Sequence, residues 1–321
     1  MTPQELATLR PRKRTLVLAL VVSALIFVLL LLMEEREVLL TTLGDADITY
    51  IAFALLADIL VIVLVTWRWH VLLERQGVRV PFAPELDMVA GSIALNNVLP
   101  SGRIAGDLVR PILLEKGFGV RKRQGYASVF VDKAFDFGFA FLLTTVFLAY
   151  LAVSRGLVGW YVVAVSIVPL LVLVAVVRNL DLLEGIALGR LGREHREVVE
   201  DVFIELRTLL HDPSTLTVCV LCTILSIVFL TIRTWFILAG LGVENVGMVV
   251  CCMIAILETM LSSVPITPGG LGFVEGGLVT FTAVLDIARG PTFTVVDRFI
   301  SYWLRTVFGL SLLGRFSNKW T

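Results

Sequence analysis

The sequence predicts an all-α, polytopic membrane protein with about six transmembrane helices and two opposed re-entrant helical hairpins. Three observations lead to this fold. Of the 321 residues, 57% are hydrophobic and only 17% are charged, and the mean hydropathy is +0.91. Apolar runs long enough to cross a bilayer recur along the chain, and two further apolar runs are interrupted by Pro and Gly. A water-soluble domain would need more polar surface than this composition supplies.

Six apolar stretches have the roughly 20 residues that a helix needs to cross the hydrocarbon core. They are 15–33, 48–73, 124–152, 157–177, 214–240 and 292–314. The first follows a basic segment and lacks a small-residue cleavage site, so we expect a retained span rather than a signal peptide. The charged segment 194–210 keeps a helical apolar pattern, which predicts an amphipathic helix at the cytoplasmic interface. The chain 1–321 is thus predicted to be a single transmembrane domain.

Charge distribution predicts the orientation of the spans. Lys and Arg gather at the N-terminus and in the loops after the second, fourth and last spans, whereas the 34–47 loop is mostly acidic. Because cytoplasmic loops are enriched in Lys and Arg, we expect a multi-pass protein of the plasma membrane with both termini cytoplasmic. The formal net charge is zero, so no bulk attraction to nucleic acid is expected.

Two other apolar stretches, 86–114 and 247–285, are broken in the middle. The first is interrupted at Pro100 and the second at Pro265 and Pro268. Proline removes a backbone donor and neighbouring glycines loosen the helix, so each break frees backbone polar groups. Such breaks are tolerated at membrane depth only inside protein or beside a watery cavity. We therefore predict two re-entrant hairpins, each made of two half-length helices.

An internal repeat relates positions that are 165 residues apart. Arg68 then falls on Arg233, Pro100 on Pro265, and the pair at 132–133 on 297–298. The halves, about 15–152 and 157–314, each contain two spans, a hairpin and a span. Three crossings precede the second half, so the halves would be inverted relative to each other. Inverted repeats with paired broken helices indicate a substrate site near the bilayer midplane.

The charged residues within apolar runs are the candidates for that site, because ionisable groups there are costly and usually face the protein interior in pairs. Asp107 and Glu275 stand at helix starts and are read either as helix caps or as site residues. The wider set is read either as a structural ion-pair network or as cations that hold a lipid phosphate. Asp58 is isolated and is not included. The predicted substrate-binding residues are Asn97, Ser101, Gly102, Gly106, Asp107, Arg110, Asp132, Lys133, Asp136, Arg233, Glu258, Thr267, Gly269, Gly270, Gly272, Glu275, Asp297 and Arg298.

Other kinds of chemistry find little support. The four cysteines all lie in apolar runs, and the CxxC pair of Cys219 and Cys222 has no second pair or histidine cluster to complete a metal site. No Ser, His and Asp set indicates a hydrolase. We therefore predict no metal, no cofactor and no catalytic residue.

The stretches LPSGRIAGDLVR, VDK and ITPGGLGFVEGGL resemble the flippase-like membrane region of the lysylphosphatidylglycerol synthase family. The resemblance covers about 15–315. The soluble aminoacyl-transferase domain of bifunctional members is not present in this sequence, so lysyl transfer is not expected. The family's motif positions correspond by resemblance to Pro100, Gly102, Gly106, Asp107, Arg110, Asp132, Pro268, Gly269, Gly270, Gly272 and Glu275. Lys133 departs from the arginine that the resemblance implies after the aspartate, and Arg298 keeps it.

We expect a lipid flippase or scramblase-like transporter for a phospholipid, an aminoacylated lipid or a polyprenyl-phosphate-linked substrate. Two alternatives are a membrane-embedded transferase acting on a lipid head group and an accessory subunit of a separate glycosyl- or aminoacyltransferase. Two opposed hairpins favour transport, because an enzyme needs access from only one face. The expected partners are membrane lipids, with a homo-oligomer or a separate lipid-modifying enzyme as further candidates.

Overall fold

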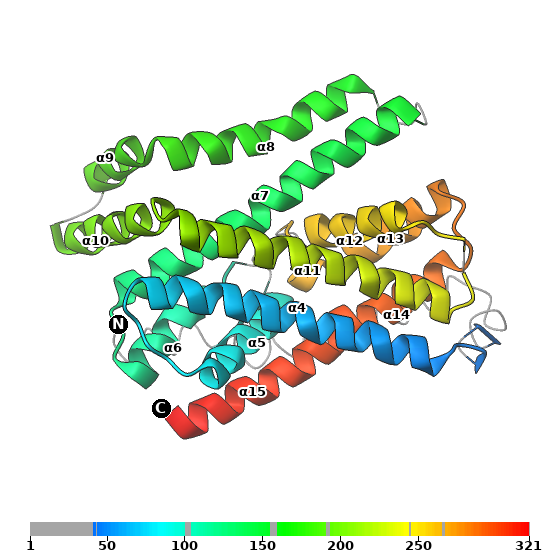
Figure 1. The fold of residues 1–321 in the computed structure, drawn as a ribbon, viewed down its shortest axis with the longest axis horizontal. Coiled ribbons are helices and arrows are strands. Elements are labelled where there is room, and N and C mark those ends of the chain that lie inside the picture. Colours follow the sequence, from blue (N-terminus) through cyan, green and yellow to red (C-terminus); the bar gives the residue numbers. More distant parts are fainter. Residues whose placement is uncertain are drawn as a thin grey trace.

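The computed structural model describes residues 41–42, 44–99, 104–154, 159–190, 193–243, 245–264 and 267–320. All regular elements within these ranges are helical (Figure 1). The predicted first span and the residues Pro100, Ser101, Gly102 and Pro265 lie outside the described residues.

The helices follow one another without an intervening strand in the described ranges. In chain order they are α4 (Ile48–Arg75), α5 (Phe82–Val98), α6 (Val109–Phe118), α7 (Lys122–Ser154), α8 (Trp160–Arg178), α9 (Leu180–Arg190), α10 (Arg193–Leu210), α11 (Pro213–Gly240), α12 (Met248–Ser262), η1 (Pro268–Gly270), α13 (Phe273–Val284), α14 (Gly290–Arg298), η2 (Phe299–Leu304) and α15 (Arg305–Trp320).

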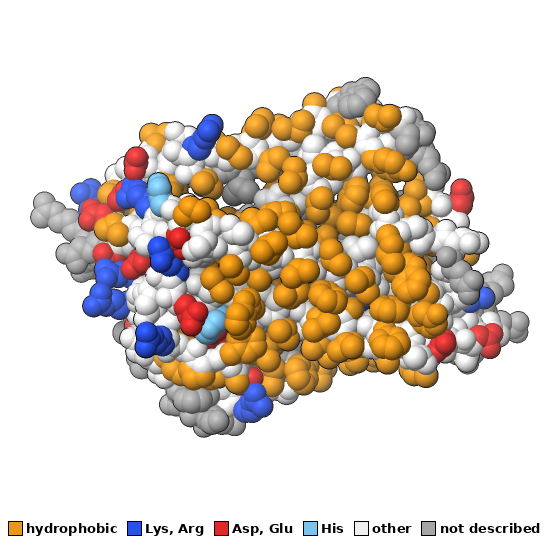
Figure 2. Space-filling view, viewed as in Figure 1, with side chains coloured by type: hydrophobic (Ala, Val, Ile, Leu, Met, Phe, Trp, Pro, Cys, Tyr) orange, Lys and Arg blue, Asp and Glu red, His pale blue; other side chains and the backbone are white. Residues whose placement is uncertain are grey.

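Three of these helices are long and apolar enough to cross a membrane: Ile48–Arg75, Lys122–Val153 and Pro213–Gly240. Large apolar side chains stay exposed along them, which suits contact with lipid rather than water. In Figure 2 the apolar side chains form a broad belt over the middle of the molecule. The charged side chains gather at its two ends, and Lys and Arg prevail at the end where α6 and α9 lie (Figures 1 and 2).

Helices α4 and α11 lie side by side and run in opposite directions (Figure 1). At one end the Asp47 N–H donates to the Gly240 carbonyl (2.9 Å). At the other end Arg75 Nε contacts the Asp212 carboxylate (3.0 Å). Contacts at both ends fix the register of the pair over its whole length.

The two helices also begin and end in the same way, with boundaries that differ by 165 residues. Asp47 and Asp212 are the N-caps, and each carboxylate accepts a hydrogen bond from a backbone N–H in the first turn. Past the C-terminal ends, Gly77 (φ 73°) and Gly242 (φ 74°) adopt the left-handed conformation that closes a helix. Equivalent local sequence thus sets equivalent helix ends.

The first broken stretch folds back on itself. The Gly106 N–H donates to Asn96 Oδ1 (2.7 Å), and Asn96 Nδ2 donates to Asp107 (2.8 Å). These bonds hold the start of α6 against the end of α5. A Cβ at Gly106 would lie 2.2 Å from the Ser92 carbonyl oxygen, so this close approach requires glycine.

The second broken stretch contains a run of glycines between α12 and α13. Gly269 (φ 58°), Gly270 (φ 72°) and Gly272 (φ 79°) all have positive φ. L-residues with a side chain rarely adopt this region, so the glycines permit a tight return that other residues would strain. The short η1 turn lies within this return and contacts α5 of the first broken stretch.

The last predicted span, 292–314, is not one regular α-helix. It consists of α14, the π-helical turn η2 and α15, which follow one another without a gap from Gly290 to Trp320. Periodic apolar spacing indicates a helix but does not distinguish a single wide turn within it. Such turns are rare and recur at functional sites, and η2 carries Ser301, which lines the charged cavity described below, and Tyr302, whose hydroxyl donates to the Asn97 carbonyl.

Candidate functional site: a cavity between two charged clusters

A first cluster of buried charges joins α4, α6 and α7. Its members are Arg68, Arg110, Lys133, Asp107, Asp132 and Asp136. Arg68 is its centre: Nε donates to Asp132 (2.6 Å), Nη2 to Asp136 (2.6 Å) and Nη1 to the hydroxyl of Thr223 (2.8 Å) on α11. The planar guanidinium thereby connects three different helices.

Arg110 and Lys133 complete this first cluster. Arg110 pairs with Asp107 (2.5 Å) and Asp132 (3.1 Å) and lies over the ring of Trp69, with Cζ 5.3 Å from the centroid. Lys133 pairs with Asp107 (3.0 Å) and with Asp136. Among the six charged side chains, only Lys133 (19%) and Asp136 (33%) retain appreciable exposure.

A second cluster of buried charges joins α4, α11, α12, α13, α14 and α15. Its members are Arg233, Arg298, Arg305, Asp58, Glu258, Glu275 and Asp297. Arg233 binds three carboxylates at once: Asp58 (2.9 Å), Asp297 (2.9 Å) and Glu258. Arg305 contacts both oxygens of Asp58, at 2.5 and 2.7 Å.

Glu275 has two partners in this second cluster. Its Oε2 accepts from the Gly272 N–H (2.6 Å) at the start of α13, and its Oε1 accepts from Arg298 Nε (2.7 Å). Glu275 is therefore a helix cap and also a member of the charged cluster. Asp107 differs, because its carboxylate binds side chains, whereas Asn96 provides the backbone contact at that turn.

The two clusters are built on the same plan. Arg68 and Arg233 occupy positions 165 apart, and each binds an aspartate at the next equivalent pair of positions, Asp132 and Asp297. The third partner of Arg68, Thr223, occupies the position equivalent to Asp58, which is a partner of Arg233. Each central arginine thus also reaches across to the helix that carries the other one.

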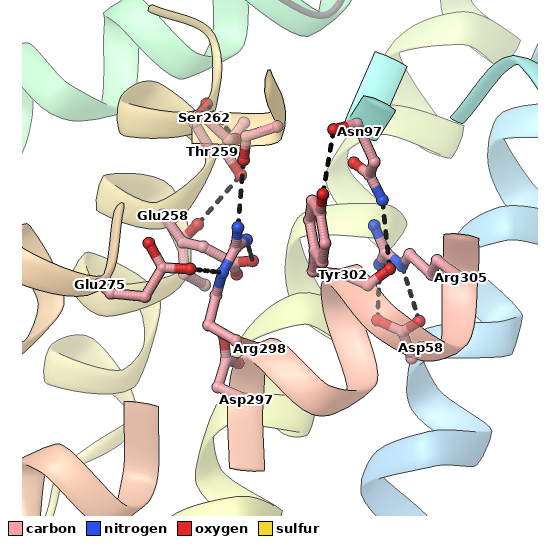
Figure 3. A network of polar contacts seen from close by, with 12 residues as sticks. Asp58, Asn97, Glu258, Thr259, Ser262, Glu275, Asp297, Arg298, Tyr302 and Arg305 are labelled. Atoms are coloured by element: carbon pink, nitrogen blue, oxygen red, sulfur yellow. Dashed lines mark hydrogen bonds and ion pairs between the residues drawn. The ribbon is translucent and has the colours of Figure 1, made fainter. Parts of the chain in front are cut away.

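Both broken stretches contact the segment from Arg298 to Thr306 between the clusters, and η1 of the second stretch also contacts α5 of the first. Asn97 Nδ2 donates to Thr306 Oγ1 (2.9 Å), and the Tyr302 hydroxyl donates to the Asn97 carbonyl (3.2 Å). Arg298 Nη2 donates to the Gly269 carbonyl (3.1 Å), and its guanidinium lies over the Tyr302 ring, with Cζ 4.9 Å from the centroid. Figure 3 shows Arg298 directed at Glu275, with Tyr302, Asn97 and Arg305 to the right of Arg298 in the view.

A cavity of about 140 Å³ lies between the clusters. Six cations and two carboxylates line it. They are Arg68, Arg110, Lys133, Arg233, Arg298, Arg305, Asp136 and Glu258. The other five carboxylates of the clusters do not line the cavity, so its wall presents an excess of positive charge. The rest of the lining consists of apolar side chains, chiefly from α4, α7 and α11, and of uncharged polar side chains such as Asn97, Thr223 and Ser301.

Comparison with known proteins identifies the family. The family described as the lysylphosphatidylglycerol synthase TM region matches residues 16–309, which include both clusters and the cavity. This chain belongs to that family. It is a membrane-embedded, multi-pass protein.

The relatives of this family member include archaeal proteins of similar length. It is 25% identical over 299 residues to a UPF0104 membrane protein of Methanothermobacter thermautotrophicus, which covers 86% of this chain and 88% of the relative. It is 22% identical over 310 residues to UPF0104 membrane protein MJ1595 of Methanocaldococcus jannaschii, which covers 90% and 91%. It is 21% identical over 317 residues to UPF0104 membrane protein PH1989 of Pyrococcus horikoshii, which covers 91% and 94%.

The structure of this family member places the predicted site residues in two groups. Those that line the cavity are Asn97, Arg110, Lys133, Asp136, Arg233, Glu258, Gly269 and Arg298. Those that lie behind the lining are Gly106, Asp107, Asp132, Thr267, Gly270, Gly272, Glu275 and Asp297. The second group supports the first, either by ion pairs or by shaping the turns at the broken stretches.

The predicted site residues left out three members of the charged clusters, Arg68, Asp58 and Arg305. Asp58 is 2% exposed and is shared by Arg233 and Arg305. The sequence signal that could have identified Asp58 is its position as a charged residue within an apolar span. By the offset of 165 it is equivalent to Thr223 on α11. Its partners lie 175 and 247 residues away, so no local pattern joins them.

Among the described residues, no group of three or more His, Cys, Asp and Glu side chains has the arrangement of a metal site. The carboxylates that come close together are each held by arginine or lysine. The charged side chains of the site are thus arginines, one lysine and carboxylates that pair with one another.

Proposed function

We propose that this protein moves a lipid with a phosphate-bearing head group between the two leaflets of the membrane. The observation that carries this proposal is the lining of the cavity, where six cations face the space and five of the seven cluster carboxylates lie behind them. Arginine suits a phosphate because its planar fork binds two oxygens at once. Candidate substrates are a phospholipid, an aminoacylated lipid and a polyprenyl-phosphate-linked sugar.

The size of the cavity supports a role in head-group binding. Its volume of about 140 Å³ corresponds to roughly five water molecules at about 30 Å³ each. That space accommodates a phosphate with a small substituent. The acyl chains would stay in the surrounding lipid while the head group crosses through protein, which avoids exposing an ion to hydrocarbon.

Both halves of the chain supply the cavity, which supports passage from one leaflet to the other. The antiparallel α4 and α11 and the paired clusters are consistent with an inverted repeat, and the two broken stretches with re-entrant hairpins that enter from opposite faces. In this arrangement, rocking of one half against the other exposes the same site alternately to each side. The ion pairs compensate the arginines when no substrate is present, because unpaired buried charges are costly.

The experiment that tests the proposal is a leaflet-exchange assay. The purified protein is reconstituted into vesicles of phosphatidylglycerol and phosphatidylethanolamine. The vesicles contain a trace of one of these two lipids with a label at the end of an acyl chain. A membrane-impermeant quencher then reports the label in the outer leaflet. We expect quenching beyond the outer-leaflet fraction with the protein and quenching limited to that fraction in protein-free vesicles. The assay is repeated with a labelled aminoacylated lipid and a labelled polyprenyl phosphate. If the folded protein leaves quenching limited to the outer-leaflet fraction for every one of these lipids, the proposal is contradicted.

Two substitutions connect the assay to the site. Arg233→Ala and Glu275→Ala, which remove one member of the second cluster each, should abolish exchange. Arg79→Ala provides a matched control, because Arg79 is an exposed arginine between α4 and α5. Each variant is first shown to elute as a single folded species in detergent. Exchange at the parental rate by folded Arg233→Ala and Glu275→Ala would mean that these charges are structural only.

A further inference from the structure

The second cluster holds one more carboxylate than it has cations. Its four carboxylates are Asp58, Glu258, Glu275 and Asp297, and its three cations are Arg233, Arg298 and Arg305. The first cluster is balanced, with three of each sign. No side chain of the second cluster is more than 11% exposed. Uncompensated charge is costly in such surroundings, so the surplus negative charge has to be neutralised.

Asp297 is the member with the fewest contacts. Its Oδ1 accepts from Arg233 Nη2 (2.9 Å), and that nitrogen is shared with Glu258. Its Oδ2 is buried and has no hydrogen-bond partner in the described structure. The other three carboxylates of the cluster use both oxygens in contacts with arginine or with a backbone N–H.

The offset of 165 between the halves explains why Asp297 lacks a second partner. In the first cluster, Asp132 accepts from Arg68 on Oδ1 and from Arg110 on Oδ2 (3.1 Å). Asp297 occupies the position equivalent to Asp132. The position equivalent to Arg110 is Glu275, where a carboxylate replaces the cation. The presence of a glutamate instead of an arginine at this position therefore removes the partner of Asp297 Oδ2 and adds a negative charge near it.

We propose that Asp297 is a proton-binding site and that one exchangeable proton sits on its carboxyl group. A proton taken from water in the cavity forms the O–H bond on Oδ2 and brings the cluster to zero net charge. Its release to the same water leaves the cluster with one negative charge. The charged groups that surround Asp297 come from every helix of the cluster: Asp58 on α4, Arg233 on α11, Glu258 on α12, Glu275 on α13, Arg298 on α14 and Arg305 on α15.

Two polar side chains connect Asp297 to the cavity. Ser301 lies four residues further along the same helical segment and therefore on the same side. It lines the cavity, and its buried hydroxyl has no hydrogen-bond partner in the described structure. Glu258 also lines the cavity and shares Arg233 Nη2 with Asp297. In this proposal the proton passes between the cavity and Asp297 by way of these two side chains.

Coupling of this proton to lipid movement rests on the function proposed above, whereas binding of the proton does not. With the proton on Asp297, the wall of the cavity next to the second cluster is more positive and favours an anionic head group. Without it, the surplus negative charge opposes the head group. Binding of lipid and binding of the proton should therefore favour each other.

Infrared difference spectroscopy of the purified wild-type protein, with no lipid substrate added, tests the proton directly. A protonated carboxyl group in an apolar site gives a carbonyl stretch that ionised carboxylates lack. We expect such a band in the difference spectrum between acidic and alkaline pH, with a shift on exchange into heavy water. The band should disappear in Asp297→Asn and persist in the matched variant Asp132→Asn.

A second variant keeps the test decisive if Asp297→Asn does not fold. Glu275→Gln removes the surplus charge, so the band should titrate at lower pH than in the wild type. Absence of the band from the wild type, its persistence in Asp297→Asn, or an unchanged titration in Glu275→Gln would overturn the proposal. If the wild-type band follows this pattern but the protein shows no leaflet exchange, the proton site is upheld and the transport function is rejected.

Discussion

At the scale of single residues, burial decides how much each charge matters. Arg233 and Asp58, which are 1% and 2% exposed, form an ion pair and contact three further charged side chains. In contrast, Arg207 contacts Asp181, whose side chain is 91% exposed. Exposed ion pairs contribute little to stability because water and salt screen them, whereas removal of one partner of a buried pair leaves the other uncompensated.

This contrast predicts the effect of Asp58→Ala. The change leaves Arg305 without its carboxylate partner and removes one of the three carboxylates that bind Arg233. We therefore expect it to lower the free energy of unfolding by about 3–5 kcal/mol. Asp181→Ala removes the same type of group from an exposed pair and should be nearly silent. Thermal unfolding in detergent measures both variants. Equal midpoints for Asp58→Ala and the parent would show that the second cluster contributes no net stability.

Gly269 tests the contact between the two broken stretches. It has φ +58°, and a Cβ there would lie 2.4 Å from Tyr302 Cε2 and 2.8 Å from the Asn97 carbonyl oxygen. Gly269→Ala should therefore push the stretches apart, lower the thermal midpoint and reduce leaflet exchange. Gly276→Ala is the control, because a Cβ at that helical glycine meets nothing within 4 Å and alanine favours a helix by about 1 kcal/mol. If the two variants behave alike, the close contact at Gly269 has no consequence.

At the scale of helices, the sequence predicted some elements closely and others less well. The expected spans 48–73 and 214–240 agree with α4 and α11 to within two residues at each end. Continuous apolar runs fix the length of these helices, and Asp47 and Asp212 mark where they begin. The π-helical turn η2 was not predicted, because a single wide turn leaves no periodic signal. The pairing of Asp58 was not predicted either, because its partners are distant in sequence.

The N-cap of α11 leads to a prediction about pH. Hydrogen bonds, chiefly from the Thr215 hydroxyl, and the nearby Arg75 guanidinium lower the pKa of Asp212 below its ordinary value. A carboxylate with a lowered pKa stabilises the folded state above the unfolded-state pKa, which is about 3.9 for aspartate, and this stabilisation is lost as the pH falls through the folded-state pKa.

The measurement for this helix is the thermal midpoint of the parent and of Asp212→Ala as a function of pH. The difference between them should be constant above about pH 5 and shrink progressively below the ordinary aspartate pKa. Arg178→Ala, at an exposed residue at the end of α8, should show no such convergence relative to the parent. A difference that stays the same down to the lowest pH would mean that the Asp212 charge does not stabilise the cap.

At the scale of the whole molecule, the charge distribution and the two pseudo-equivalent halves predict the topology. The basic end of the molecule is the end where α4 leads into α5 and where α6 lies, and α4 begins at the opposite end (Figures 1 and 2). Arg79 lies between α4 and α5, Lys116 lies on α6, and Asp45 lies just before α4. Because basic loops stay in the cytoplasm, we expect residues 79 and 116 to face the cytoplasm and residue 45 to face outside.

Single cysteines at these positions test the topology in a background that lacks the four native cysteines. Asp45→Cys should react with an impermeant maleimide added to intact cells. Arg79→Cys and Lys116→Cys, which are equally exposed positions, should react only after the cells are opened. Labelling of Lys116→Cys from outside would be incompatible with the inverted arrangement of the two halves.

In the function proposed above, lipid head groups cross through the cavity between the two clusters. The sequence predicted most of the charges that line this cavity, because arginine and aspartate are rare in apolar runs. It could not predict which of them face the space, since that depends on contacts between residues of different halves. Ser263, which follows the last residue of α12, lines the cavity, is partly exposed and belongs to neither charged cluster.

The most direct measurement is leaflet exchange by a protein whose only cysteine is Ser263→Cys, before and after reaction with a charged methanethiosulfonate. The reagent adds bulk to the cavity of an already folded protein, and a reductant removes it again. Exchange should stop when mass spectrometry shows complete modification and should recover after reduction. Continued exchange at the unmodified rate by the fully modified protein would show that lipid does not pass through this cavity.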